Sequence, residues 1–163
     1  MTVYDDRVVK ASELFRKGFQ CSQAVFAAFA PGYGLSEEQA LRIGAGFGGG
    51  MCKGEVCGAV TGALMVIGLV HGHDDPEDAE GNARVKRLTR EMMDRFSGEN
   101  GSFVCRDLLG YDLSSDGESR IARDMGLFTE FCPRMVISAS EMLADILELS
   151  LIHISEPTRH LRI

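Results

Sequence analysis

Residues 46–68 read GFGGGMCKGEVCGAVTGALMVIG, and this stretch decides the fold. Its first part is rich in glycine, which loses the most backbone entropy in a helix or strand, so we expect a shaped loop over residues 45–55. Its second part, from Cys57 to Leu69, is apolar at nearly every position. Such a segment predicts a central helix packed on all sides. Cys52 lies in the loop, five residues before Cys57.

Helical signals flank this stretch on both sides. Ser36 and Gln39 match the capping box of a helix start. Pro76 directly after Asp75 suits the first turn of a long charged helix, and residues 97–101 predict a turn after it. Strand alternation is missing, so the sequence predicts an all-α, single-domain bundle of six or seven helices. The expected helical segments are residues 5–17, 20–30, 36–44, 57–69, 76–96, 102–110, 118–125 and 133–149.

Composition and charge indicate that residues 1–150 form a single domain. A chain of 163 residues with 45% hydrophobic content can bury about 70% of its unfolded surface. The net charge of -7 excludes a nucleic-acid surface, which needs clustered Lys and Arg. The apolar run Ala59–Val70 is shorter than the roughly 20 residues that a bilayer requires, which argues against membrane insertion. The N-terminus shows no export signal, so we expect a cytoplasmic location.

The final segment, residues 151–163, reads LIHISEPTRHLRI and differs from what precedes it. The helical face of the preceding segment has ended, and Pro157 interrupts any continuation. The segment resembles peptides translated from sequencing-adapter DNA. We therefore expect a non-native or disordered tail and exclude it from functional reasoning.

Two further motifs favour ordinary structure over a ligand site. The run GAGFGG at residues 44–49 satisfies G-x-G-x-x-G, but a helix is expected before it and no acid follows about 20 residues later, so it is no dinucleotide fingerprint. His71 and His73 stand beside two aspartates after the apolar segment. We interpret them as a solvated loop, because no further histidine lies nearby in the sequence.

The cysteines are the strongest functional candidates. An odd number in a chain expected in a reducing compartment disfavours a disulfide framework and favours metal binding or redox chemistry. Three of them, Cys21, Cys57 and Cys132, fall in or beside the first turn of an expected helix, where free amides and the helix dipole stabilise a thiolate. The five are Cys21, Cys52, Cys57, Cys105 and Cys132.

The cysteines are widely spaced in the sequence, and their spacing does not identify which metal or redox chemistry they support. The gaps of 31, 5, 48 and 27 residues are unlike the C-x-x-C pairs of zinc ribbons, thioredoxins and ferredoxins. A C-x-x-C-H motif is missing from the sequence, which excludes covalent haem attachment. Four cysteines from separate helices can still converge and hold an iron-sulfur cluster, as bundle cores hold metals.

The segment CGAVTG at residues 57–62 resembles the CGAxxG signature of the C-GCAxxG-C-C family of small redox-active proteins. The resemblance covers residues 5–148. It includes an isolated upstream cysteine (FQCSQAV), the GFGGG run, a cysteine before Leu-Leu-Gly (CRDLLG) and a late cysteine. It implies that four cysteines carry a redox or cluster-binding role and leaves Cys52 outside the site. The four are Cys21, Cys57, Cys105 and Cys132.

Gly58 and Gly62 complete the candidate site. They lie four residues apart on one face of the expected central helix, where missing side chains admit an inorganic group or a neighbouring backbone. Plain helix packing explains them almost equally well. The two explanations are compatible if the neighbouring helix carries Cys21 or Cys132.

Three hypotheses remain at this point. The first is an electron-transfer or redox-sensing protein whose four cysteines bind a cluster, [2Fe-2S] before others, with zinc as the alternative metal. The second is metal-free thiol-disulfide chemistry in which Cys57 attacks and Cys52 is near enough in sequence to resolve. The third is a helical interaction module with structural cysteines. We expect a redox partner protein and no nucleic-acid partner, and a homodimer stays open.

Overall fold

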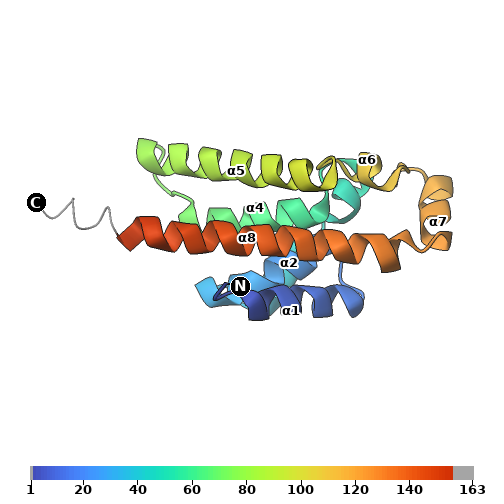
Figure 1. Cartoon of the computed structure of the whole chain (residues 1–163), viewed down its shortest axis with the longest axis horizontal. Helices are drawn as coiled ribbons and strands as arrows, with labels where there is room; N and C mark the ends of the chain where they lie inside the picture. The colour runs from blue at the N-terminus through green and yellow to red at the C-terminus, as the bar shows by residue number, and fades with distance from the viewer. Residues whose placement is uncertain (1, 156–163) are drawn as a thin grey trace, which may run out of the picture.

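The chain folds as a bundle of helices (Figure 1). A computed structural model describes the backbone of residues 2–155 and the side chains of residues 2–151. The helices are α1 (Asp5–Arg16), α2 (Cys21–Phe29), α3 (Glu37–Gly44), α4 (Gly58–His71), α5 (Ala79–Asn100), α6 (Cys105–Leu109), α7 (Asp116–Asp124) and α8 (Cys132–Ser155). Three short turns are η1 (Ala30–Tyr33), η2 (Gly50–Gly54) and η3 (Leu127–Phe131).

The all-α prediction is confirmed, although the described residues form eight α-helices where six or seven were expected. Each of the eight segments expected to be helical overlaps one of these helices. Over the same residues, the only β pairing is an isolated antiparallel bridge between Val56 and Val104. None of the described helices is long and apolar enough to cross a membrane.

The core lies where α4 packs against α2, α5 and α8, while α1 packs against α2 and α8. Close approach of α2 and α4 depends on Gly62, because a Cβ there would lie 2.8 Å from the Ser22 carbonyl oxygen. The tight contact is therefore between two helix backbones. The largest fully buried side chains are Phe29, Phe96, Leu14, Ile67, Met92, Leu143, Ile146 and Leu147.

The sequence predicted the start of α3 correctly, but the start of α5 lies at a different residue from the one predicted. The capping box is confirmed: Ser36 Oγ accepts from the Gln39 amide at 3.1 Å, and α3 begins at Glu37. The start of α5 differs, because Asp78 and not Asp75 is its cap, accepting from the Gly81 amide at 2.9 Å. Asp75 and Asp78 are both preferred N-cap residues, so the sequence alone did not distinguish between them.

The ends of the two long helices also differ from expectation. The turn predicted at residues 97–101 is wrong, because α5 continues to Asn100, whose side-chain amide donates to Ser138 Oγ on α8. Helix α8 continues past its expected end to Ser155. Residues 156–163, which hold most of the predicted tail, lie outside the described part of the chain, so that prediction stays a prediction.

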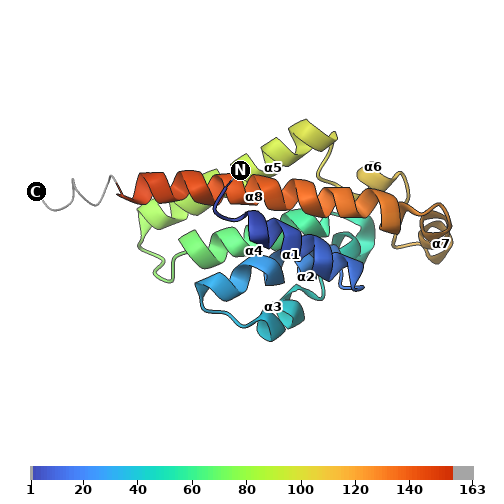
Figure 2. The same cartoon turned by 60° about the horizontal axis from the view of Figure 1, so that its bottom comes forward.

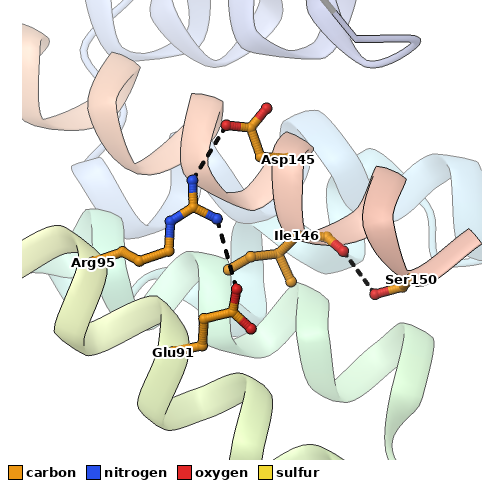
Figure 3. A network of polar contacts seen from close by, with 5 residues as sticks. All are labelled: Glu91, Arg95, Asp145, Ile146 and Ser150. Carbon is orange, nitrogen blue, oxygen red and sulfur yellow. Dashed lines mark hydrogen bonds and ion pairs between the residues drawn. The ribbon is translucent and has the colours of Figure 1, made fainter. Parts of the chain in front are cut away.

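Polar contacts join α5 to α8 along their exposed sides (Figure 3). Arg95 pairs with Asp145 on α8 at 3.3 Å and with Glu91 on its own helix at 3.7 Å. Within α8 itself, the buried Ser150 Oγ donates to the Ile146 carbonyl at 2.7 Å. Exposed pairs of this kind contribute about 0.2–1 kcal/mol each, so apolar packing supplies most of the stability of this helix pair.

The loop before α4 contains an unusual left-handed turn. Four successive residues, from Gly49 to Cys52, have φ between 58° and 63°. Two of them, Met51 and Cys52, are not glycine, and each such residue costs roughly 1–2 kcal/mol in this conformation. Gly50 cannot be replaced easily, because a Cβ there would clash with the Glu55 backbone.

Candidate functional site

The structure places four of the five cysteines around one cavity of about 410 Å³. Cys21, Cys105 and Cys132 are the first residues of α2, α6 and α8, and Cys57 is the N-cap of α4. All four thiols therefore stand at helix N-termini. Cys52 is exposed in η2 and does not line the cavity.

The walls of the cavity are mainly apolar. Phenylalanines come from the α1–α2 region and from η3, and leucines come from α6 and the loop after it. The volume lies in the range of roughly 300–1,000 Å³ that is usual for small-molecule and cofactor sites. The principal apolar side chains are Phe15, Phe19, Leu108, Leu113, Phe128 and Phe131.

The sulfur of Cys21 lies among backbone amides from three elements. Burial raises the pKa of the Cys21 thiol, and amide hydrogen bonds from Gly49 in the glycine loop, Ser22 in α2 and Gly58 in α4 oppose that rise. Gly58 is required here, because a Cβ would clash with Cys21 Sγ and lie 3.0 Å from the Phe47 carbonyl oxygen. Gly58 also lines the cavity, whereas Gly62 packs against α2 and does not line it.

The isolated bridge fixes the relation between Cys57 and Cys105. Each follows a bridged valine, the Cys57 amide donates to the Phe103 carbonyl at 2.8 Å, and the Cys105 amide donates to the Glu55 carbonyl. The two cysteines are thus diagonal neighbours across an antiparallel pair, where Cα atoms lie about 7–8 Å apart.

Sequence reasoning missed this bridge. Its only signal is the Val-Cys dipeptide, which occurs as Val56-Cys57 and Val104-Cys105. A single bridged residue on each side is too short to show strand alternation. The ion pair between Arg106 and Glu55, with nitrogen and oxygen 3.1 Å apart, spans the same two segments.

Thiol acidity differs from the expectation for helix starts. Burial raises the pKa of both the Cys105 and Cys132 thiols to about 12, with the Cys21 charge adding to each. Burial, followed by the charge of Cys21, raises the pKa of Cys57 far above its usual range. The protein alone therefore holds neutral thiols at neutral pH, which argues against a low-pKa nucleophile at Cys57. Loss of hydration outweighs the amides and the helix dipole.

The four thiols share a cavity without converging on one point. Among the described side chains, no three or more from His, Cys, Asp or Glu form a group that could hold a single metal ion.

His71 is a separate difference from the sequence interpretation. It lies at the far end of α4 from Cys57, is only 5% exposed, and its Nε2 has no hydrogen-bond partner among the described residues. Burial lowers its pKa, and the charges of Arg84 and Arg87 act in the same direction. The solvated-loop interpretation is thus wrong for His71, because helix packing covers it.

Comparison with protein families supports the same four-cysteine region. Residues 19–146 match the family model described as "Putative redox-active protein (C_GCAxxG_C_C)". No curated protein and no solved structure shows significant similarity to the chain. The matched range contains all five cysteines and covers most of the chain. The chain therefore belongs to the C_GCAxxG_C_C family.

Proposed function

We propose that this protein is a redox protein that binds an iron-sulfur cluster through Cys21, Cys57, Cys105 and Cys132 and uses it for electron transfer or redox sensing. One observation carries the proposal: four thiols from the starts of four helices line one apolar cavity. Membership of a redox-active family supports it. The cluster, when bound, would supply the one-electron chemistry that the side chains themselves lack.

The residues present fit such a group. Four thiols are the usual donor set for an iron-sulfur cluster, and [2Fe-2S] is the type we favour. Amides from Gly49 and Gly58 donate toward Cys21 Sγ, and hydrogen bonds to sulfur tune the reduction potential. In this proposal α4 is the central helix, and the glycine-rich loop before it supplies one of these amides. The apolar walls exclude water.

Protons must leave when the group binds. Burial raises the pKa of Cys105 and Cys132 to about 12, so these thiols are neutral until a metal displaces their protons. Thiolate is the ligating form, so loading should release protons and be favoured at higher pH. Burial also raises the pKa of the Cys57 thiol, which argues against Cys57 as a free nucleophile.

We also propose that the protein acts in a reducing compartment and exchanges electrons with another protein. A reducing compartment such as the cytoplasm keeps these thiols free for a metal. A redox partner protein would exchange electrons with the buried site. Zinc in the same thiols is the competing occupant, and elemental content separates the two.

Anaerobic reconstitution with iron and sulfide tests the proposal, using the intact protein and single Cys→Ser variants. The intact protein should bind iron and acid-labile sulfide and develop visible absorption. Cys21→Ser, Cys57→Ser, Cys105→Ser and Cys132→Ser should each lose most of the iron. Cys52→Ser is the matched control and should retain it. A protein that stays colourless and takes up zinc alone, or equal loss in the Cys52 variant, contradicts the proposal.

A further inference from the structure

The cavity has one charged side chain among its described lining residues. Arg123 of α7 lines it, and no Asp or Glu does. The guanidinium is therefore the only permanently charged group among these lining side chains. An apolar site with a single fixed cation selects an anion over a neutral or cationic molecule.

The charge of Arg123 is not used within the fold. Within residues 2–151, ion pairs are found for Lys10, Arg95 and Arg106, and Arg123, like the other Lys and Arg residues there, has none. Neighbouring Arg120 is also on α7; both arginines are exposed, but only Arg123 lines the cavity. A free guanidinium can bind a planar carboxylate through two parallel hydrogen bonds.

The rest of the lining suits a flat apolar body. Phe15 and Phe19 approach from the N-terminal side and Phe128 and Phe131 from η3, and Leu108 comes from α6. Aromatic side chains bind flat rings by offset or edge-to-face contact. The cavity of about 410 Å³ accommodates a molecule of this kind.

We propose that the cavity binds a small organic anion, with its carboxylate at Arg123 and its flat apolar body among the phenylalanine rings beside the cysteines. This goes beyond the proposed cluster function and rests on the cavity alone. It names the chemical class of a ligand, a monocarboxylate with an aromatic or similarly flat body.

Calorimetric titration of the metal-free, reduced protein with 2-naphthoate tests the proposal. The uncharged amide of the same ring system, 2-naphthamide, is the matched ligand. We expect 2-naphthoate to bind and Arg123→Gln to weaken it about two- to fivefold, in proportion to one ion pair at an exposed position. Arg120→Gln removes the same charge one turn earlier on α7 and should change binding less than about twofold. Arg123→Lys should retain part of the affinity. The uncharged 2-naphthamide should bind Arg123→Gln and Arg120→Gln with the same affinity.

Alkylation by N-ethylmaleimide, followed by mass spectrometry, locates the ligand. Bound 2-naphthoate should slow labelling of Cys105 and Cys132, which line the cavity, and leave the exposed Cys52 unchanged. Equal binding to intact protein and Arg123→Gln, or protection of Cys52 as strongly as Cys132, overturns the proposal. Because both measurements use metal-free protein, failure to bind iron would leave the ligand result standing, and the reverse also holds.

Discussion

At the scale of single residues, the candidate site depends on glycines, whose lack of a side chain leaves room for neighbouring atoms. Gly58 leaves the space that Cys21 Sγ occupies, and its amide donates toward the same sulfur. The residue therefore sets both the position and the hydrogen bonding of one thiol. Gly62, four residues later, has a different role, because its lack of a side chain allows α2 to approach α4 closely.

Gly58→Ala should destabilise the protein by about 1–3 kcal/mol, because the added methyl group forces Cys21 or α2 to move. Urea unfolding measures the change. Gly68→Ala on the same helix is the control, since a Cβ there meets nothing within 4 Å, and it should stabilise by about 0.5–1 kcal/mol. Similar effects of the two substitutions would contradict the role assigned to Gly58.

The buried thiols predict a loss of stability in alkaline solution. Burial raises the pKa of Cys105 from 9.0 to about 12, so between these values the unfolded chain loses the thiol proton and the folded chain keeps it. The contribution is complete below pH 9.0 and declines as pH rises through that window, by up to about 1.4 kcal/mol per pH unit.

Urea unfolding of reduced, metal-free protein at several pH values above neutral measures this decline. Cys105→Ala should make it shallower, whereas Cys52→Ala, at an exposed position, should leave it unchanged. Identical slopes in the two variants would mean that the Cys105 thiol is not responsible.

At the scale of elements, the left-handed turn from Gly49 to Cys52 is the strained part of the molecule. Met51 has φ 58°, so Met51→Gly should remove an unfavourable conformation and raise the free energy of unfolding by about 0.5–1 kcal/mol after the entropy of glycine is subtracted. Lys53→Gly in the same loop, at a position without positive φ, should lower it. Thermal or urea unfolding checks both, and a destabilised Met51→Gly would show that the Met51 side chain matters more than its backbone.

The sequence predicted those elements whose signals are local. The Ser36–Gln39 capping box and the positions of Cys57 and Cys132 at helix starts depend on a few neighbouring residues, and the structure has them there. The bridge between Val56 and Val104 depends on pairing across 48 residues, which no local pattern encodes. His71 is buried for a similar reason, because tertiary packing overrides its polar neighbourhood.

The cysteine cavity was predictable only in part. The number and positions of the thiols favoured metal or redox chemistry, but their acidity could not be predicted, because the loss of hydration that raises the pKa depends on packing by distant helices. Arg123 gave no signal at all in the sequence. It is one of two arginines on a charged helix, and only the position of α7 brings it to the cavity.

At the scale of the whole molecule, α7 is the least anchored helix. It lies across the end of the bundle (Figure 2), packs mainly on η3, and buries only Ala122, whereas α4 buries eight residues. Native-state hydrogen exchange should therefore be about 100-fold or more faster in α7 than in α4. Mass spectrometry of exchanged peptides measures this, with α2 as a well-buried reference. Equal protection of α7 and α4 would contradict this description.

The bridge from Val56 to Val104 also has a consequence for biosynthesis. Cys21 and Cys57 emerge from the ribosome early, but the second half of the bridge and Cys105 follow about 50 residues later, and Cys132 later still. At about 5–20 residues per second, the growing chain spends several seconds with only two of the four cavity thiols and no enclosed cavity. Assembly of a four-thiol site must therefore wait until Cys132, the first residue of α8, has been made.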